Sequence, residues 1–76
     1  MTRYFFDVNA KSSLQYDYSG RSLAGIDEAH RLAELIAIDL ACTQGERTRG
    51  YEVEVRDSAG KLFLSVPVHS AELTTA

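Results

Sequence analysis

The side chains best suited to metal chemistry fall on one predicted helix. Asp27, His30 and Glu34 are spaced by three and four residues, so a helix would project all three to one side. Such spacing is equally typical of a solvated helix face, and no second cluster in the sequence completes a coordination shell. A metal- or ligand-binding enzyme is therefore an alternative hypothesis only, and we assign no metal ligand.

The single cysteine, Cys42, gives little support for catalysis and cannot form an internal disulfide. A catalytic thiolate needs a cationic neighbour or a helix N-terminus, whereas Cys42 lies near the predicted C-terminal end of the helix. The serines and histidines form no nucleophile motif, and the five glycines form no phosphate-binding motif. We predict no catalytic residue, no cofactor and no enzymatic activity.

Four basic residues are candidate contacts to nucleic acid, in the loop after the helix and around the last turn. They are Arg47, Arg49, Arg56 and Lys61. Aromatic side chains on a sheet could stack bases beside them. The net charge is -3, however, and Glu52 and Glu54 would face the same side of the sheet and repel phosphates. A nucleic-acid-associated regulator, antitoxin-like or accessory, is thus a second alternative.

The elements that position these residues belong to one small domain spanning residues 1–76. A chain of 76 residues buries only about 60% of its unfolded surface and holds one core. Residues 69–76 show no pattern and are predicted to fray. The sequence shows neither a signal peptide nor an apolar run of spanning length, so we expect a soluble, cytoplasmic protein without a membrane partner.

The chain predicts two hairpins joined by one helix. Strands are expected over residues 3–9, 14–18, 51–56 and 62–68, with a turn at 19–22 and a helix over 26–43. This ββαββ order predicts an α+β fold with the helix packed on one face of a four-stranded sheet. Because the first and last strands carry apolar residues on both faces, we expect them to be central and mutually parallel, in the β-grasp-like order 2-1-4-3. Pro67 fits that order only at the end of a ladder.

The predicted helix has clear ends and one apolar stripe. Gly25 is a tolerable N-cap, Glu28 can reach back as in a capping box, and Gly45 is placed to end the helix. The core-facing stripe is expected to contain Ile26, Ala29, Ala33, Ile36, Ala37 and Leu40.

Some apolar residues remain after this core is assigned. On the helix, Leu35 and Ile38 lie outside the stripe, and the series Arg31, Leu35, Ile38 and Cys42 has spacings of 4, 3 and 4 residues. On the sheet, Phe5 and Phe63 are the apolar residues left over. Single exposed apolar residues are normal, but a small domain gains much from burying them. We therefore expect a non-enzymatic protein-interaction module, a homodimer or a binder of another protein. Its candidate interface residues are Phe5, Phe63, Leu35 and Ile38.

The turn Asp57–Gly60 decides which face Phe63 occupies. A loop of two or four residues places Leu62 and Leu64 with Val53 and Val55, and Phe63 on the open side. A type I turn with a G1 bulge at Gly60 instead places Phe63 beneath the helix. Either register leaves apolar side chains on both faces of the last strand.

Taken together, several motifs resemble a family of very short bacterial proteins of unknown function. They are the opening "MTRYFFDV", the "DYSG" after the second strand, the Ala-rich helix after "LAGIDEA", and "YEVEVRDSAGKLFLSVP" with its D-x-x-G hairpin and proline. The resemblance covers nearly the whole chain and implies a small α+β domain in a bacterial cytoplasm. It implies no activity and no site residue. The chain departs from the family pattern at "AKSS", which lacks an Asp-Gly, and at Gly25, where Asp is commoner.

Overall fold

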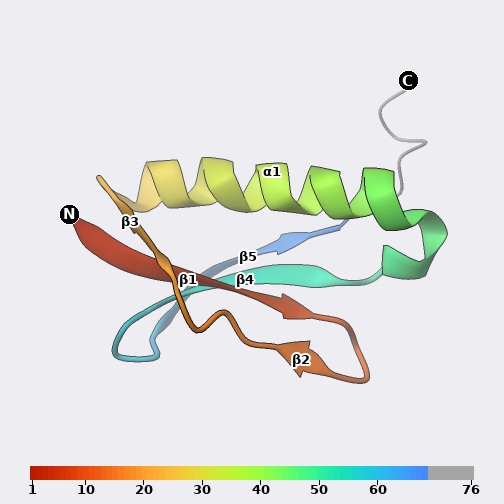
Figure 1. Ribbon diagram of the computed structural model, residues 1–76, viewed down its shortest axis with the longest axis horizontal. Coiled ribbons are helices and arrows are strands. Elements are labelled where there is room, and N and C mark those ends of the chain that lie inside the picture. The colour runs from red at the N-terminus through yellow and green to blue at the C-terminus, as the bar shows by residue number, and fades with distance from the viewer. Residues whose placement is uncertain (69–76) are drawn as a thin grey trace.

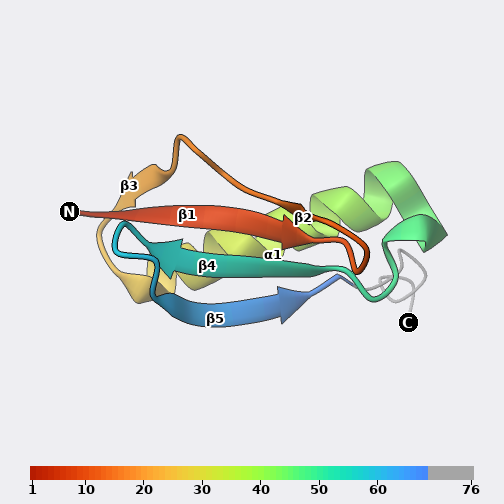
Figure 2. The same ribbon diagram turned by 90° about the horizontal axis from the view of Figure 1, so that it is seen from below.

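The computed structural model describes residues 1–68, and the fraying predicted for residues 69–76 lies outside them. One helix lies along one face of an antiparallel sheet (Figures 1 and 2), so the predicted α+β class is confirmed. The elements are β1 (Thr2–Asn9), β2 (Leu14–Gln15), β3 (Arg21–Leu23), α1 (Ile26–Gln44), the 3-10 helix η1 (Gly45–Thr48), β4 (Glu52–Asp57) and β5 (Leu62–Pro67). In this part of the chain, no helix combines the length and the apolar character that crossing a membrane requires.

The strand order differs from the predicted one. The sheet runs β2-β1-β4-β5, with β3 also paired to β1, and every pairing is antiparallel. β4 is therefore the neighbour of β1, and the expected parallel pairing of the first and last strands is wrong. β5 lies at the edge, where Pro67 is well tolerated. The Val68 N–H donates to Tyr51 O (2.9 Å). Because backbone groups alternate in direction along an antiparallel strand, the Pro67 nitrogen points toward the unpaired edge of β5.

The predicted second strand is shortened to two residues, and a strand that was not predicted follows it. β2 contains only Leu14 and Gln15, and the chain then leaves the sheet and returns as β3 at Arg21, inside the region expected to be a turn. We call the intervening residues 16–20 the strap. β2 pairs with the C-terminal end of β1 and β3 with its N-terminal end, so the strap runs past the middle of β1, along the edge away from β4 (Figure 2).

α1 begins after Gly25 as predicted and ends one residue beyond the predicted boundary. The Gly45 N–H donates to Ala41 O at its end, and Glu28 Oε1 accepts a hydrogen bond from the N–H of Ala24 (3.2 Å) at its start. The buried strip of α1 that faces the sheet is narrow, and the buried residues in it are all alanines. Ile26, expected in the core-facing stripe, is exposed at the helix start. The buried core consists of Tyr4, Phe6, Ala29, Ala33, Ala37, Ala41, Val53, Val55 and Val68.

The β4–β5 hairpin combines features of both expected registers. Asp57 O accepts a hydrogen bond from the N–H of Gly60 (3.0 Å), and Gly60 adopts a φ of 88°. Asp57 N–H in turn donates to Lys61 O, which closes a three-residue loop. This is the turn with a G1 bulge.

A second irregularity, in β5, then restores the alternation of side chains between the two faces of the sheet. Leu62 lies opposite Arg56 and Leu64 lies opposite Val55, so Phe63 is an additional residue in β5. Leu64 and Val66 consequently pack beneath α1. The rings of Phe63 and the buried Tyr4 form a T-shaped contact, with centroids 5.9 Å apart. The placement of Leu64 with Val55 agrees with the first of the two expected registers, because one bulge offsets the other.

Candidate functional site

The strap is held to the sheet by one carboxylate. Asp17 Oδ2 accepts a hydrogen bond from the N–H of Phe6 in β1, and Asp17 Oδ1 accepts two from the N–H groups of Ser19 and Gly20, each at 3.1 Å. Phe6 is the middle one of the three β1 residues between the stretches paired with β2 and β3. The Asp17 side chain thus replaces a strand at the point where the strap leaves the sheet.

Asp7 and Arg56 extend this network across the open face, the sheet face away from α1. Asp7 is 2% exposed; its Oδ1 accepts from the N–H of Asp17 (2.9 Å) and its Oδ2 from Arg56 Nε (2.6 Å). A second guanidinium nitrogen of Arg56 donates to Asp17 O (3.2 Å). The guanidinium carbon of Arg56, Cζ, lies 4.8 Å from the centroid of the Phe5 ring and 5.8 Å from the centroid of the Tyr16 ring.

The electrostatics of this network favour its charged state. Burial raises the pKa of Asp17, but the N–H groups of Gly20, Phe6 and Ser19 and the charge of Arg56 outweigh that effect. The pKa of Asp17 therefore lies below its ordinary value of 3.8. The hydrogen bond with Asp7 raises the pKa of Arg56, which stays protonated. Each of the four carboxylate oxygens of the two aspartates accepts at least one hydrogen bond, so the network ties the strap to β1 and β4.

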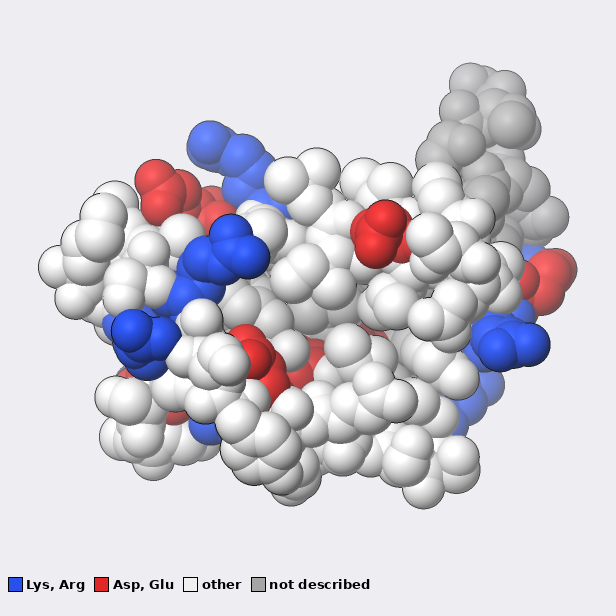
Figure 3. Space-filling view, viewed as in Figure 1, with Lys and Arg blue, Asp and Glu red and all other residues white. Residues whose placement is uncertain are grey.

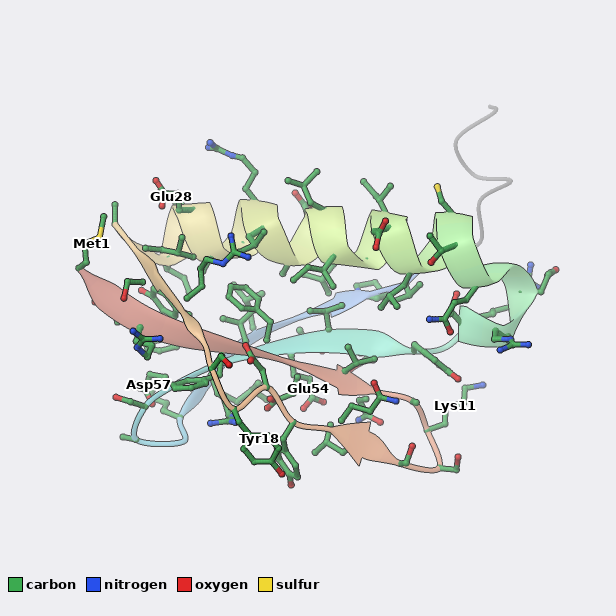
Figure 4. All side chains as sticks on the ribbon, in the orientation of Figure 1. Met1, Lys11, Tyr18, Glu28, Glu54 and Asp57 are labelled. Atoms are coloured by element: carbon green, nitrogen blue, oxygen red, sulfur yellow. The ribbon has the colours of Figure 1, made fainter. Side chains whose placement is uncertain are left out.

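The network covers the phenylalanine at the centre of the open face. Phe5 is half-buried, with Arg56 over its ring and Gly20 against its edge, where a Cβ on residue 20 would lie 2.8 Å from Phe5 Cε2. Tyr18 and Glu54 lie on the side of the sheet away from α1 (Figure 4). The remaining acidic groups there, Glu52 and Glu54, accept hydrogen bonds from Ser65 Oγ and Asn9 Nδ2.

The candidate interface residues form separate surfaces. Phe5 lies on the open face, whereas Phe63 contacts Tyr4 and has the Lys61 ammonium 5.5 Å from its ring centroid. Leu35 and Ile38 lie on the outer face of α1, where 58% and 52% of their surfaces are exposed. The structure therefore separates the two phenylalanines and brings the two helix residues together. Their role in an interface stays a prediction.

The four basic candidates are also dispersed. Arg56 is engaged by Asp7, and Arg49 pairs with Glu46 (3.2 Å). Arg47 and Arg49 lie in or beside η1, while Lys61 lies in the β4–β5 hairpin at the other end of β4 (Figure 1). On the face drawn in Figure 3, basic side chains likewise lie toward the two ends of the molecule. No continuous phosphate-binding surface links the four residues.

The candidate metal ligands remain on one exposed face of α1. His30 Nε2 lies 3.6 Å from Glu34 Oε2, as expected for residues four apart on a helix. Across residues 1–68, no three His, Cys, Asp or Glu side chains gather closely enough to hold a metal ion. The thiol of Cys42 is exposed on the same helix.

Comparison with known proteins places the chain in a family. A model of a domain of unknown function, DUF6894, matches residues 3–69. The chain belongs to this family. No curated protein and no solved structure matches the chain.

The network of Asp7, Asp17 and Arg56 in this DUF6894 domain was missed by sequence reasoning, although two signals for it were present. Asp17 and Gly20 form a D-x-x-G sequence like that of Asp57 and Gly60, and in both the aspartate side chain accepts backbone N–H groups. A carboxylate in an aromatic strand, Asp7, also needs a buried partner. The period-two pattern of residues 14–18 concealed the strap, because Tyr16 and Tyr18 alternate as in a strand.

Proposed function

We propose that this protein is a non-enzymatic protein-interaction module of the bacterial cytoplasm, which self-associates through the outer face of α1. The observation that carries the proposal is the adjacent exposure of Leu35 and Ile38. With Arg31 and Cys42 they follow spacings of 4, 3 and 4 along the helix, which is the spacing of a helix-pairing seam. We call these four residues the outer stripe.

The other surfaces are less suited to self-association. The open face has its central phenylalanine covered by Arg56 and the strap. The free edge of β5 carries a bulge at Phe63 and the donor-free Pro67, two features that oppose strand addition. The outer edge of β1 is occupied by β2, β3 and Asp17. Leu35 and Ile38 of the outer stripe thus form an exposed apolar pair that neither the strap nor a strand bulge obstructs.

The expected affinity follows from the area available. Complete burial of a Leu or Ile side chain stabilises by about 1.5–3 kcal/mol, so the exposed half of each retains about 1 kcal/mol. A symmetric dimer buries two such side chains from each copy, or about 4 kcal/mol before the entropic cost of association. Such a small interface supports at best a weak dimer, with a dissociation constant of about a millimolar or above.

Sedimentation equilibrium over that concentration range tests the proposal. Wild type is expected to show a reversible monomer–dimer equilibrium, and Leu35→Lys or Ile38→Lys to shift it strongly toward monomer. Leu62→Lys is the matched control, because Leu62 is 54% exposed but lies on β5. Far-UV circular dichroism checks that each variant is folded. A wild type that stays monomeric at millimolar concentration would overturn the proposal, as would equal effects of Leu35→Lys and Leu62→Lys.

A further inference from the structure

The charges beside the outer stripe define an arrangement for the dimer, an inference that rests on the proposed self-association. We infer that two copies pair their α1 helices antiparallel, about a two-fold axis at Leu35, with Arg31 of each copy facing Asp39 of the other. The juxtaposition of these residues around one exposed leucine carries the inference.

Arg31 and Asp39 are equidistant from Leu35. Each lies four residues away, or about 6 Å along the helix axis, in opposite directions. A two-fold axis perpendicular to the helix at Leu35 therefore brings Arg31 level with Asp39 of the second copy, twice in the same interface. The same axis places Leu35 against its own copy and Ile38 level with Leu32, which is half-buried at the margin of the core. Such an interface is self-complementary and closes as a dimer.

The two charges are available for this contact. Both side chains are exposed, and within residues 1–68 neither forms an ion pair. Arg31 is the one Lys or Arg of α1, and Asp39 is the one acidic residue in its C-terminal half. Glu34, three residues from Arg31, already contacts His30 at 3.6 Å.

The parallel arrangement is disfavoured by the same residues. In register, it would set Arg31 against Arg31 and Asp39 against Asp39, and would align the two helix dipoles in the same direction. The antiparallel arrangement converts both repulsions into attractions. It also opposes the acidic first turn of one α1, with Asp27 and Glu28, to the last turn of the other, which contains no acidic residue.

Charge reversal with complementation tests this arrangement in the full-length protein. Arg31→Asp and Asp39→Arg are each expected to raise the dimer dissociation constant about tenfold, because each replaces two attractions by two repulsions. The double variant Arg31→Asp/Asp39→Arg is expected to return to within about threefold of wild type. An equimolar mixture of the two single variants is expected to form a heterodimer, in which both facing pairs are again oppositely charged. Arg47→Asp, an exposed charge reversal outside α1, serves as the control.

The outcomes separate this inference from the proposed function. A wild-type dimer that loses affinity in the single variants and regains it in the mixture supports the antiparallel pairing. A wild-type dimer sensitive to Leu35→Lys but without complementation in the mixture or the double variant overturns this arrangement and leaves the proposed function standing. A monomeric wild type overturns both.

Discussion

Replacing Gly20 by alanine tests whether the strap is packed as tightly against the sheet as the structure shows. Gly20 has a φ of 73°, in the left-handed region, where an L-residue costs roughly 1–2 kcal/mol. A Cβ at this position would lie 2.8 Å from Phe5 Cε2 and 3.0 Å from Arg3 Cγ. Overpacking of this kind costs about 1–3 kcal/mol more. Gly20→Ala should therefore lower the free energy of unfolding by about 2–5 kcal/mol.

Gly60→Ala provides the matched control. Gly60 has a φ of 88°, but a Cβ there would meet no atom within 4 Å, so only the backbone cost of about 1–2 kcal/mol applies. Urea unfolding, monitored by far-UV circular dichroism, measures both losses. All samples have the same protein concentration, so that any self-association contributes equally. The predicted difference is large for a domain of this size, whose total stability is of the order of 4–11 kcal/mol. Equal losses in the two variants would refute the close contact between the strap and Phe5.

Two further predictions concern the network and the core. Because the pKa of Asp17 in the folded protein lies below its ordinary value of 3.8, its ionised carboxylate contributes stability that is present at neutral pH and lost as the pH falls below about 4. Asp17→Asn should therefore reduce stability at pH 7 and flatten its decline in acid; urea midpoints from pH 7 to 3 that fall in parallel for both proteins would contradict this. Ala33, which is fully buried, faces the sheet, so Ala33→Leu should cost about 1–3 kcal/mol in the same urea assay. Unchanged stability of Ala33→Leu would mean that α1 is not in close contact with the sheet.

The sequence predicted those features that local chemistry determines. The bounds of α1 followed from Gly25, Gly45 and the period of its alanines, and the structure confirms the start and moves the end by one residue. The hairpin of β4 and β5 followed from alternation around a D-x-x-G turn. The exposure of Leu35 and Ile38 followed from their position outside the apolar stripe. Each of these depends on residues close together in the chain.

The features that were not predicted depend on side chains meeting across the fold. Apolar residues on both faces of β5 indicated a central strand, but a bulge at Phe63 turns one of them toward Tyr4 at the sheet margin. The strand order followed that error. Residues 14–18 alternate like a strand, yet Asp17 gains more from three backbone N–H groups than from continuing a ladder. No local pattern shows that Arg56 will lie beside Asp7.

The strap also has a consequence for the nascent chain. Every segment that covers the outer edge of β1, including Asp17, lies within the first 23 residues, whereas β4 pairs with the opposite edge from residue 52 onward. Closing the shorter loops costs less conformational entropy, and the ribosome supplies these residues first. Before β4 is synthesised, β1 can therefore have only one unpaired edge. During synthesis this halves the backbone that is open to strands from other chains.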